Sequence, residues 1–148
     1  MKHLALPIIF FLFTMAVHAE EFGQRVINTG AVECTRDVVV FQQTWVNPQP
    51  FPIRIVRSQL WIGADKDIVA DIAVAARRTS DNNLINEFPW DRYENPTGKH
   101  HNTQANDLWI APGDGIVLTW LCAWYNQEPG IKHAAFELNV WWVKRGKL

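Results

Sequence analysis

Residues suited to bind a ligand are concentrated in the polar segment 90–106. We identify Trp90, Asp91, Arg92, Tyr93, His100 and His101 as its candidate ligand-binding residues. Flat aromatic rings beside side chains that donate and accept hydrogen bonds are typical of surfaces that bind carbohydrate. We expect the segment to form one long loop, and loops of this length are often functional. The alternative is an ordinary loop in which Trp90 and Tyr93 fold back onto the edge of the core.

Trp141 is the seventh candidate, because it lies on the polar side of an amphipathic segment. In residues 133–144 two faces alternate, one with Phe136, Leu138, Val140 and Trp142, the other with Glu137, Asn139 and Trp141. Strict alternation predicts a half-buried strand. A tryptophan on the exposed face of such a strand indicates a contact surface, since large aromatic rings are enriched there.

Metal binding and catalysis have weaker support in the sequence. His100 and His101 are adjacent, so in a strand they point to opposite faces, and their spacing from Asp91 or His133 matches no known ligand pattern. We therefore expect no metal site and no cofactor. The sequence contains no nucleophile elbow and no glycine-rich phosphate loop, so an enzyme is disfavoured.

Several aspartates are expected to have local or surface roles. Asp65, Asp67 and Asp71 lie in and after a turn, but this run lacks the bidentate glutamate of a calcium-binding loop. Asp114 stands between two glycines, which is typical of a turn residue that bonds its own backbone.

The first 19 residues are expected to be a secretory signal peptide. Lys2 precedes an apolar run over residues 4–17, and Val17-His18-Ala19 resembles a small-residue cleavage site. The run is shorter than the roughly 20 residues that span a bilayer. We therefore place one folded domain at residues 20–148, in a secreted or periplasmic protein with no membrane span after cleavage.

The two cysteines, Cys34 and Cys122, are predicted to form a disulfide. An exported chain meets an oxidising compartment, and two cysteines allow one pairing. Cys122 has no adjacent histidine or acid that would activate it as a nucleophile.

Composition excludes two broad classes of protein. The chain of 148 residues is 48% hydrophobic and 20% charged, with a formal net charge of −1. It is too apolar for a disordered chain, and it lacks the basic excess of a nucleic-acid-binding protein.

Patterns of period two predict an all-β fold. Strands are expected over residues 24–28, 33–46, 53–62, 68–77, 84–88, 107–110, 115–125 and 133–144. Segment 68–77 also fits a helical face because it is rich in alanine. Segment 115–125 is apolar on both faces, which predicts a central strand, and we expect it to form a hairpin with 133–144 through the turn 126–130.

Seven or eight such strands predict a two-sheet antiparallel sandwich. A jelly-roll-like topology is favoured over an immunoglobulin-like one, because the cysteines lie near opposite ends of the chain. The predicted function is a secreted, disulfide-bridged binding module that contacts carbohydrate or another exposed surface through aromatic rings. The alternative is a non-catalytic structural or interaction subunit of the cell envelope or of a secreted assembly. The sequence leaves the oligomeric state open.

Overall fold

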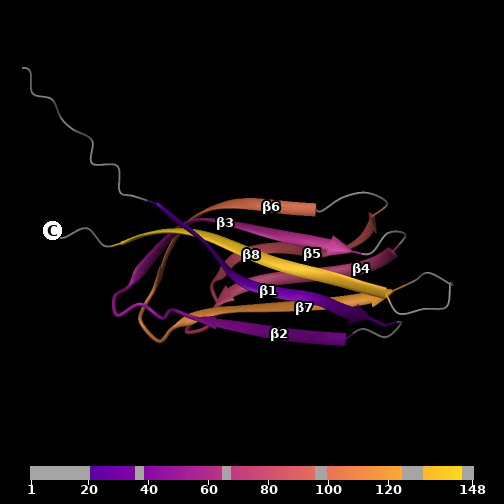
Figure 1. Cartoon of the computed structure of the whole chain (residues 1–148), viewed down its shortest axis with the longest axis horizontal. Helices are drawn as coiled ribbons and strands as arrows, with labels where there is room; N and C mark the ends of the chain where they lie inside the picture. Colours follow the sequence, from indigo (N-terminus) through magenta and orange to yellow (C-terminus); the bar gives the residue numbers. More distant parts are fainter. Residues whose placement is uncertain (1–20, 36–38, 65–67, 96–99, 125–131, 145–148) are drawn as a thin grey trace, which may run out of the picture.

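Eight strands make up most of the described chain. The computed structural model describes residues 21–35, 39–64, 68–95, 100–124 and 132–144 (Figure 1). The strands are β1 (Phe22–Cys34), β2 (Val39–Val46), β3 (Ile53–Ala64), β4 (Ile68–Arg78), β5 (Leu84–Asn95), β6 (His100–Ile110), β7 (Gly115–Trp124) and β8 (Lys132–Lys144). The predicted signal peptide 1–19, the turn 126–130 and the side chains of Asp65 and Asp67 lie outside the described residues.

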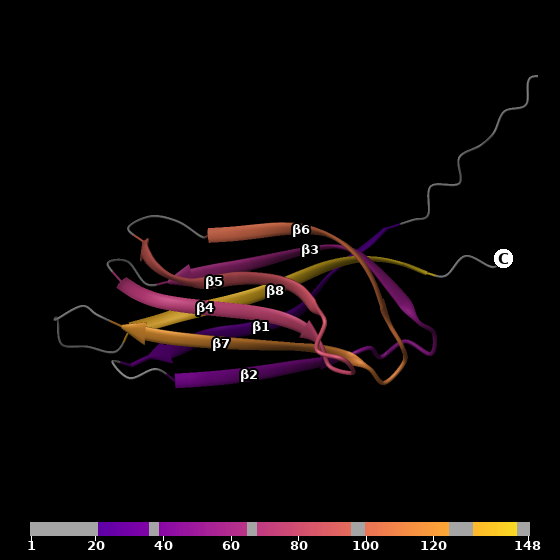
Figure 2. The same ribbon diagram turned by 180° about the vertical axis from the view of Figure 1, so that it is seen from behind.

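The strands form two four-stranded sheets that pack face to face (Figures 1 and 2). Sheet A has the order β1-β8-β3-β6, and sheet B has the order β2-β7-β4-β5. The first strand pairs with the last, the second with the seventh, the third with the sixth and the fourth with the fifth, all antiparallel. This nested pairing is the jelly-roll topology, so the predicted fold is confirmed.

The core lies between the inner faces of the sheets, where the predicted alternation is also confirmed. Ile116, Leu118, Trp120 and Cys122 of β7 and Phe136, Leu138, Val140 and Trp142 of β8 are all buried. The rings of Trp120 and Phe136 meet across the two sheets with centroids 5.3 Å apart. Such burial of large apolar side chains is the main term that stabilises the sandwich.

The alanine-rich segment forms strand β4 rather than a helix. Its inward side chains, Ala70, Ile72, Val74 and Ala76, are each at most 1% exposed. Both edges of β4 are hydrogen-bonded, one to β5 and the other to β7. Tertiary pairing on both sides thus outweighs the helical propensity of alanine.

The prediction of one long loop over residues 90–106 is wrong, because β5 runs to Asn95 and β6 begins at His100. A register shift in β5 places Pro89 and Trp90 opposite Ala73, so the alternation that marks a strand is interrupted there. Proline is tolerated at this position because β5 is an edge strand. Edge strands also accept polar side chains, which is why the segment reads as a loop.

The predicted hairpin of β7 and β8 is also wrong. The two strands lie at the centres of different sheets and face each other across the core. Each strand therefore needs apolar residues on its inner face. Two adjacent strands of one hairpin would have the same pattern, so the sequence could not distinguish the two arrangements.

The predicted break at Thr29 and Gly30 lies within strand β1. Gly30 has a positive φ of 64°, and its N–H donates to Asn28 Oδ1 at 3.0 Å. This geometry shifts the register against β8 without ending the strand. The chain leaves sheet A only after Cys34, and β2 starts at Val39 rather than at residue 33.

The predicted disulfide between Cys34 and Cys122 is confirmed, and it links sheet A to sheet B. The two residues are separated by 88 positions, and both are buried. The disulfide is consistent with an oxidising compartment.

Candidate functional site

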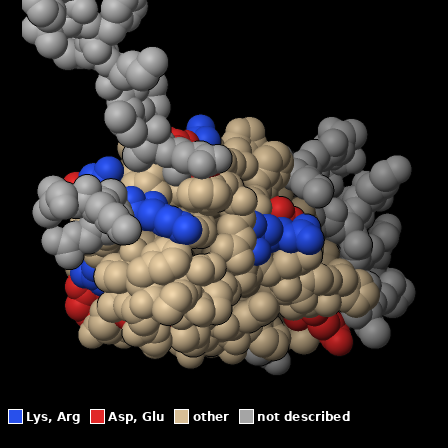
Figure 3. All heavy atoms as spheres, turned by 60° about the vertical axis from the view of Figure 1, so that its left-hand side comes forward, with Lys and Arg blue, Asp and Glu red and all other residues tan. Residues whose placement is uncertain are grey.

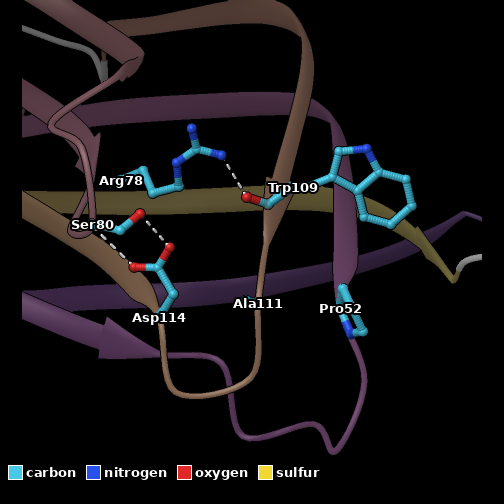
Figure 4. A pocket seen from close by; sticks show the side chains of 6 residues that line it. All are labelled: Pro52, Arg78, Ser80, Trp109, Ala111 and Asp114. Atoms are coloured by element: carbon cyan, nitrogen blue, oxygen red, sulfur yellow. Dashed lines mark hydrogen bonds between the residues drawn. The ribbon is translucent and has the colours of Figure 1, made fainter.

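A hollow of about 580 Å³ opens at the end of the sandwich where three connections meet (Figure 4). We call it the end pocket; its lining residues are Pro52, Arg78, Ser80, Trp109, Ala111 and Asp114. These residues come from the connection before β3, from the end of β4 and its turn, and from the end of β6 and its turn.

Asn47 fixes two of these connections to each other. Its amide nitrogen donates to the carbonyl oxygens of Phe51 at 3.2 Å and of Ile110 at 3.1 Å. Its backbone N–H donates to the carbonyl oxygen of Asp114 at 2.8 Å. Asn47 is 3% exposed, so these bonds are protected from water. The proline-rich segment 47–52 forms neither strand nor helix, as its sequence predicts.

Arg78 is held rigidly in the end pocket. Its Nη1 donates to the carbonyl oxygen of Trp109 at 2.7 Å, and its Nε and Nη2 donate to the carboxylate of Asp81. The hydrogen bonds from Arg78 lower the pKa of Asp81 to about 2, and the same pairing raises the pKa of Arg78. These contacts use three of the five N–H donors of the guanidinium, so two remain for a ligand.

Asp114 provides a second fixed charge. Its carboxylate accepts hydrogen bonds from Ser80 Oγ at 2.6 Å, from Thr79 Oγ1 at 3.1 Å and from the backbone N–H of Gly115 at 2.8 Å. Burial alone would raise the pKa of Asp114, but these donors together lower it. The predicted turn role is confirmed by the bond to Gly115, while the bonds to Ser80 and Thr79 tie this turn to the one after β4.

Trp109 supplies an exposed aromatic surface. Its side chain is 41% exposed. Figure 4 shows its indole next to Pro52, on the opposite side of the strand from its own carbonyl group, which accepts the hydrogen bond from Arg78. The end pocket therefore combines a flat apolar part with a part of fixed donors and acceptors.

The predicted ligand-binding residues lie on separate surfaces. Trp90 is 48% exposed and forms one wall of a shallow groove of about 380 Å³ on the outer face of sheet B. Ala73, Ala75 and Leu121 are among the other residues that line this groove. Asp91 and Arg92 follow Trp90 in β5 and are exposed. The Nε of Arg92 lies 3.3 Å from Oδ1 of Asp71.

Tyr93 and His100 face each other at the rim of the core. Their ring centroids are 5.4 Å apart, and Tyr93 also packs edge-on against Phe88 at 5.9 Å. Burial raises the pKa of Tyr93, with a smaller contribution from the charge of Asp91. Tyr93 therefore packs against the core, as the alternative expected of it, whereas Trp90 is exposed.

His101 points to the opposite side of β6 from His100. It packs against Trp61 on the outer face of sheet A, with the rings tilted by 34° and their centroids 4.8 Å apart. The two histidines thus diverge as alternation along a strand requires. Within the described part of the chain, no group of three His, Cys, Asp or Glu residues could hold a metal ion.

Trp141 also lies on the outer face of sheet A, but it is only half-exposed. The guanidinium of Arg57 lies 4.2 Å from the centre of its ring. A methyl group added at Gly23 would come within 2.9 Å of its Nε1, so the indole extends over this glycine. Arg57 and Gly23 therefore occupy much of the ring surface that a ligand would need.

Sequence reasoning missed Arg78, Ser80 and Trp109 as members of one site. A signal for Trp109 was present, because alternation over residues 107–110 places it on the face opposite to Leu108 and Ile110. No local pattern could indicate that the turns after β4 and β6 meet, since 34 residues separate Ser80 from Asp114.

No protein-family model and no curated protein matches the chain. Solved structures with some similarity include infectious bursal disease virus Gx strain (8% identity, TM-score 0.44) and the VP2 subviral particle of the same virus (12% identity, TM-score 0.39). They cover 88% and 84% of this chain, which spans about a third of theirs. Among the described residues there is no helix long and apolar enough to cross a lipid bilayer.

Proposed function

We propose that the protein is a non-catalytic binding module, secreted or periplasmic, whose end pocket takes a neutral carbohydrate. The observation that carries this proposal is that one hollow is lined both by the exposed indole of Trp109 and, on the other side of strand β6, by the immobilised Arg78 and Asp114. A sugar ring presents an apolar face that can stack on an aromatic ring and hydroxyl groups that both donate and accept hydrogen bonds.

The balance of charge favours a neutral ligand over an anionic one. Arg78 is paired with Asp81, and Asp114 adds a further negative charge in the lining. Figure 3 turns this end of the molecule forward and shows its Lys and Arg residues in separate groups divided by uncharged surface. The described residues form no concentrated positive field here, so they give the end pocket little to attract a phosphate or a polyanion.

The proposal is tested by isothermal titration calorimetry with a panel of soluble neutral oligosaccharides. Trp109→Ala should weaken binding by roughly 30-fold, which corresponds to about 2 kcal/mol for loss of a central tryptophan. Trp90→Ala is the matched control, because Trp90 has similar exposure in a different groove. The proposal fails if the wild type binds no member of the panel, or if Trp90→Ala abolishes binding and Trp109→Ala does not.

One observation favours a second candidate function, that of an interaction subunit. Val40 and Val46 are 60% and 51% exposed on strand β2, which lies at an edge of sheet B. Exposed apolar side chains on a sheet edge are typical of a surface that contacts protein.

A further inference from the structure

Strand β2 is a sheet edge to which no other described strand pairs. It pairs with β7 on one side, and Figures 1 and 2 show it as the outermost strand of sheet B. Alternate residues of an edge strand direct their backbone N–H and C=O groups away from the sheet, where another strand can bind them.

Natural edge strands are usually blocked by charges, prolines or bulges, and β2 has none of these. Its sequence, VVFQQTWV, contains no charged residue, no proline and no glycine. Its register against β7 is unbroken over eight residue pairs. The other three edge strands, β1, β5 and β6, each carry charged residues and register shifts against their neighbours.

We infer that β2 pairs antiparallel with β2 of a second copy of this chain, which joins two copies of sheet B into one continuous sheet about a twofold axis. A twofold interface brings the same surface of each copy together, so that surface must be complementary to itself. The sequence of β2 meets this requirement in one register.

In the register centred on Gln43, Val40 of one copy lies opposite Val46 of the other, and Gln42 lies opposite Thr44. All four side chains are on the outer face of sheet B. The two most exposed valines would thereby cover each other, and no like charges would meet.

The inner side chains match in the same register. Phe41 of one copy lies opposite Trp45 of the other, and both rings are half-buried against the core. A shift of the pairing by one residue would bring outer residues against inner ones. Centring the pairs on Gln42 instead would place Val40 opposite Thr44 and leave Val46 without a partner in the described strand.

The inference is tested by sedimentation velocity of the protein at about 100 µM, a concentration chosen so that a small interface can still be detected. The wild type should sediment as a dimer. The double variant V40K/V46K should be monomeric, because the register places two introduced lysines opposite each other at each end. V40K/V46E should dimerise again, because each lysine then faces a glutamate.

Leu84→Lys serves as the matched control, because Leu84 is 43% exposed on the opposite edge of sheet B, and it should leave the dimer intact. Circular dichroism checks that every variant is folded. A monomeric wild type overturns the inference, as does a V40K/V46K variant that stays dimeric or a V40K/V46E variant that stays monomeric. Carbohydrate binding at the end pocket is independent of all these outcomes.

Discussion

Removing the disulfide should cost a large part of the stability of the folded domain. The perturbation is the double variant Cys34→Ala/Cys122→Ala. The cross-link closes a loop of 88 residues, for which the chain-entropy model gives about 4.6 kcal/mol of stabilisation. Domains of this size have a total stability of roughly 5–15 kcal/mol, so the loss should be between a third and nearly all of it.

The assay is urea unfolding of the protein, followed by tryptophan fluorescence. Wild-type protein with and without a reductant provides the control, because the reduced wild type and the double variant lack the same cross-link. The midpoint should fall strongly in both. The reasoning is refuted if the double variant loses less than about 1 kcal/mol, since the link between the two sheets would then add little.

Two further predictions concern the Arg78–Asp81 pair next to the end pocket and the close backbone contact at Gly115. The pKa of Asp81 is lowered from 3.8 to about 2 by its hydrogen bonds with Arg78, so this pair stabilises the folded state above pH 4 and the contribution is lost as the pH falls toward 2. Urea unfolding between pH 2 and 7 should show this loss in the wild type and a smaller one in Asp81→Asn. Gly115→Ala should destabilise the domain by about 3 kcal/mol or more, because the added methyl group would overlap the carbonyl oxygen of Trp45 on the paired strand. In Gly23→Ala the three nearest atoms to the added methyl group all belong to the movable side chain of Trp141, so this variant should cost under about 1 kcal/mol in the same urea unfolding experiment. Equal losses in both variants would contradict this account.

Alternation of apolar residues was sufficient to predict the fold class. In β8 it identified both the inward face with Phe136 and the outward position of Trp141, because a strand with neighbours on both sides has a regular side-chain period. The same signal failed in β5, where the shift at Pro89 and Trp90 interrupts the period. It also could not give strand order, because adjacency along the chain does not determine adjacency in a sheet.

The site was less predictable than the fold, because its residues meet through long-range contacts. The interaction of Arg57 with Trp141 depends on pairing between β3 and β8, which no local pattern encodes. The end pocket likewise depends on Asp114 reaching the turn that contains Ser80. Sequence reasoning could recognise suitable residue types, such as exposed tryptophans, but not which of them lie beside fixed polar groups.

The most direct test of carbohydrate binding at the end pocket is a nuclear magnetic resonance titration that follows the indole N–H signals. Each of the eight tryptophans gives its own signal, so a single experiment compares Trp109 with Trp90, Trp61 and Trp141. We predict that a neutral oligosaccharide shifts the Trp109 signal most. Shifts confined to Trp90 or Trp141, or no shift of any indole signal, would contradict the account.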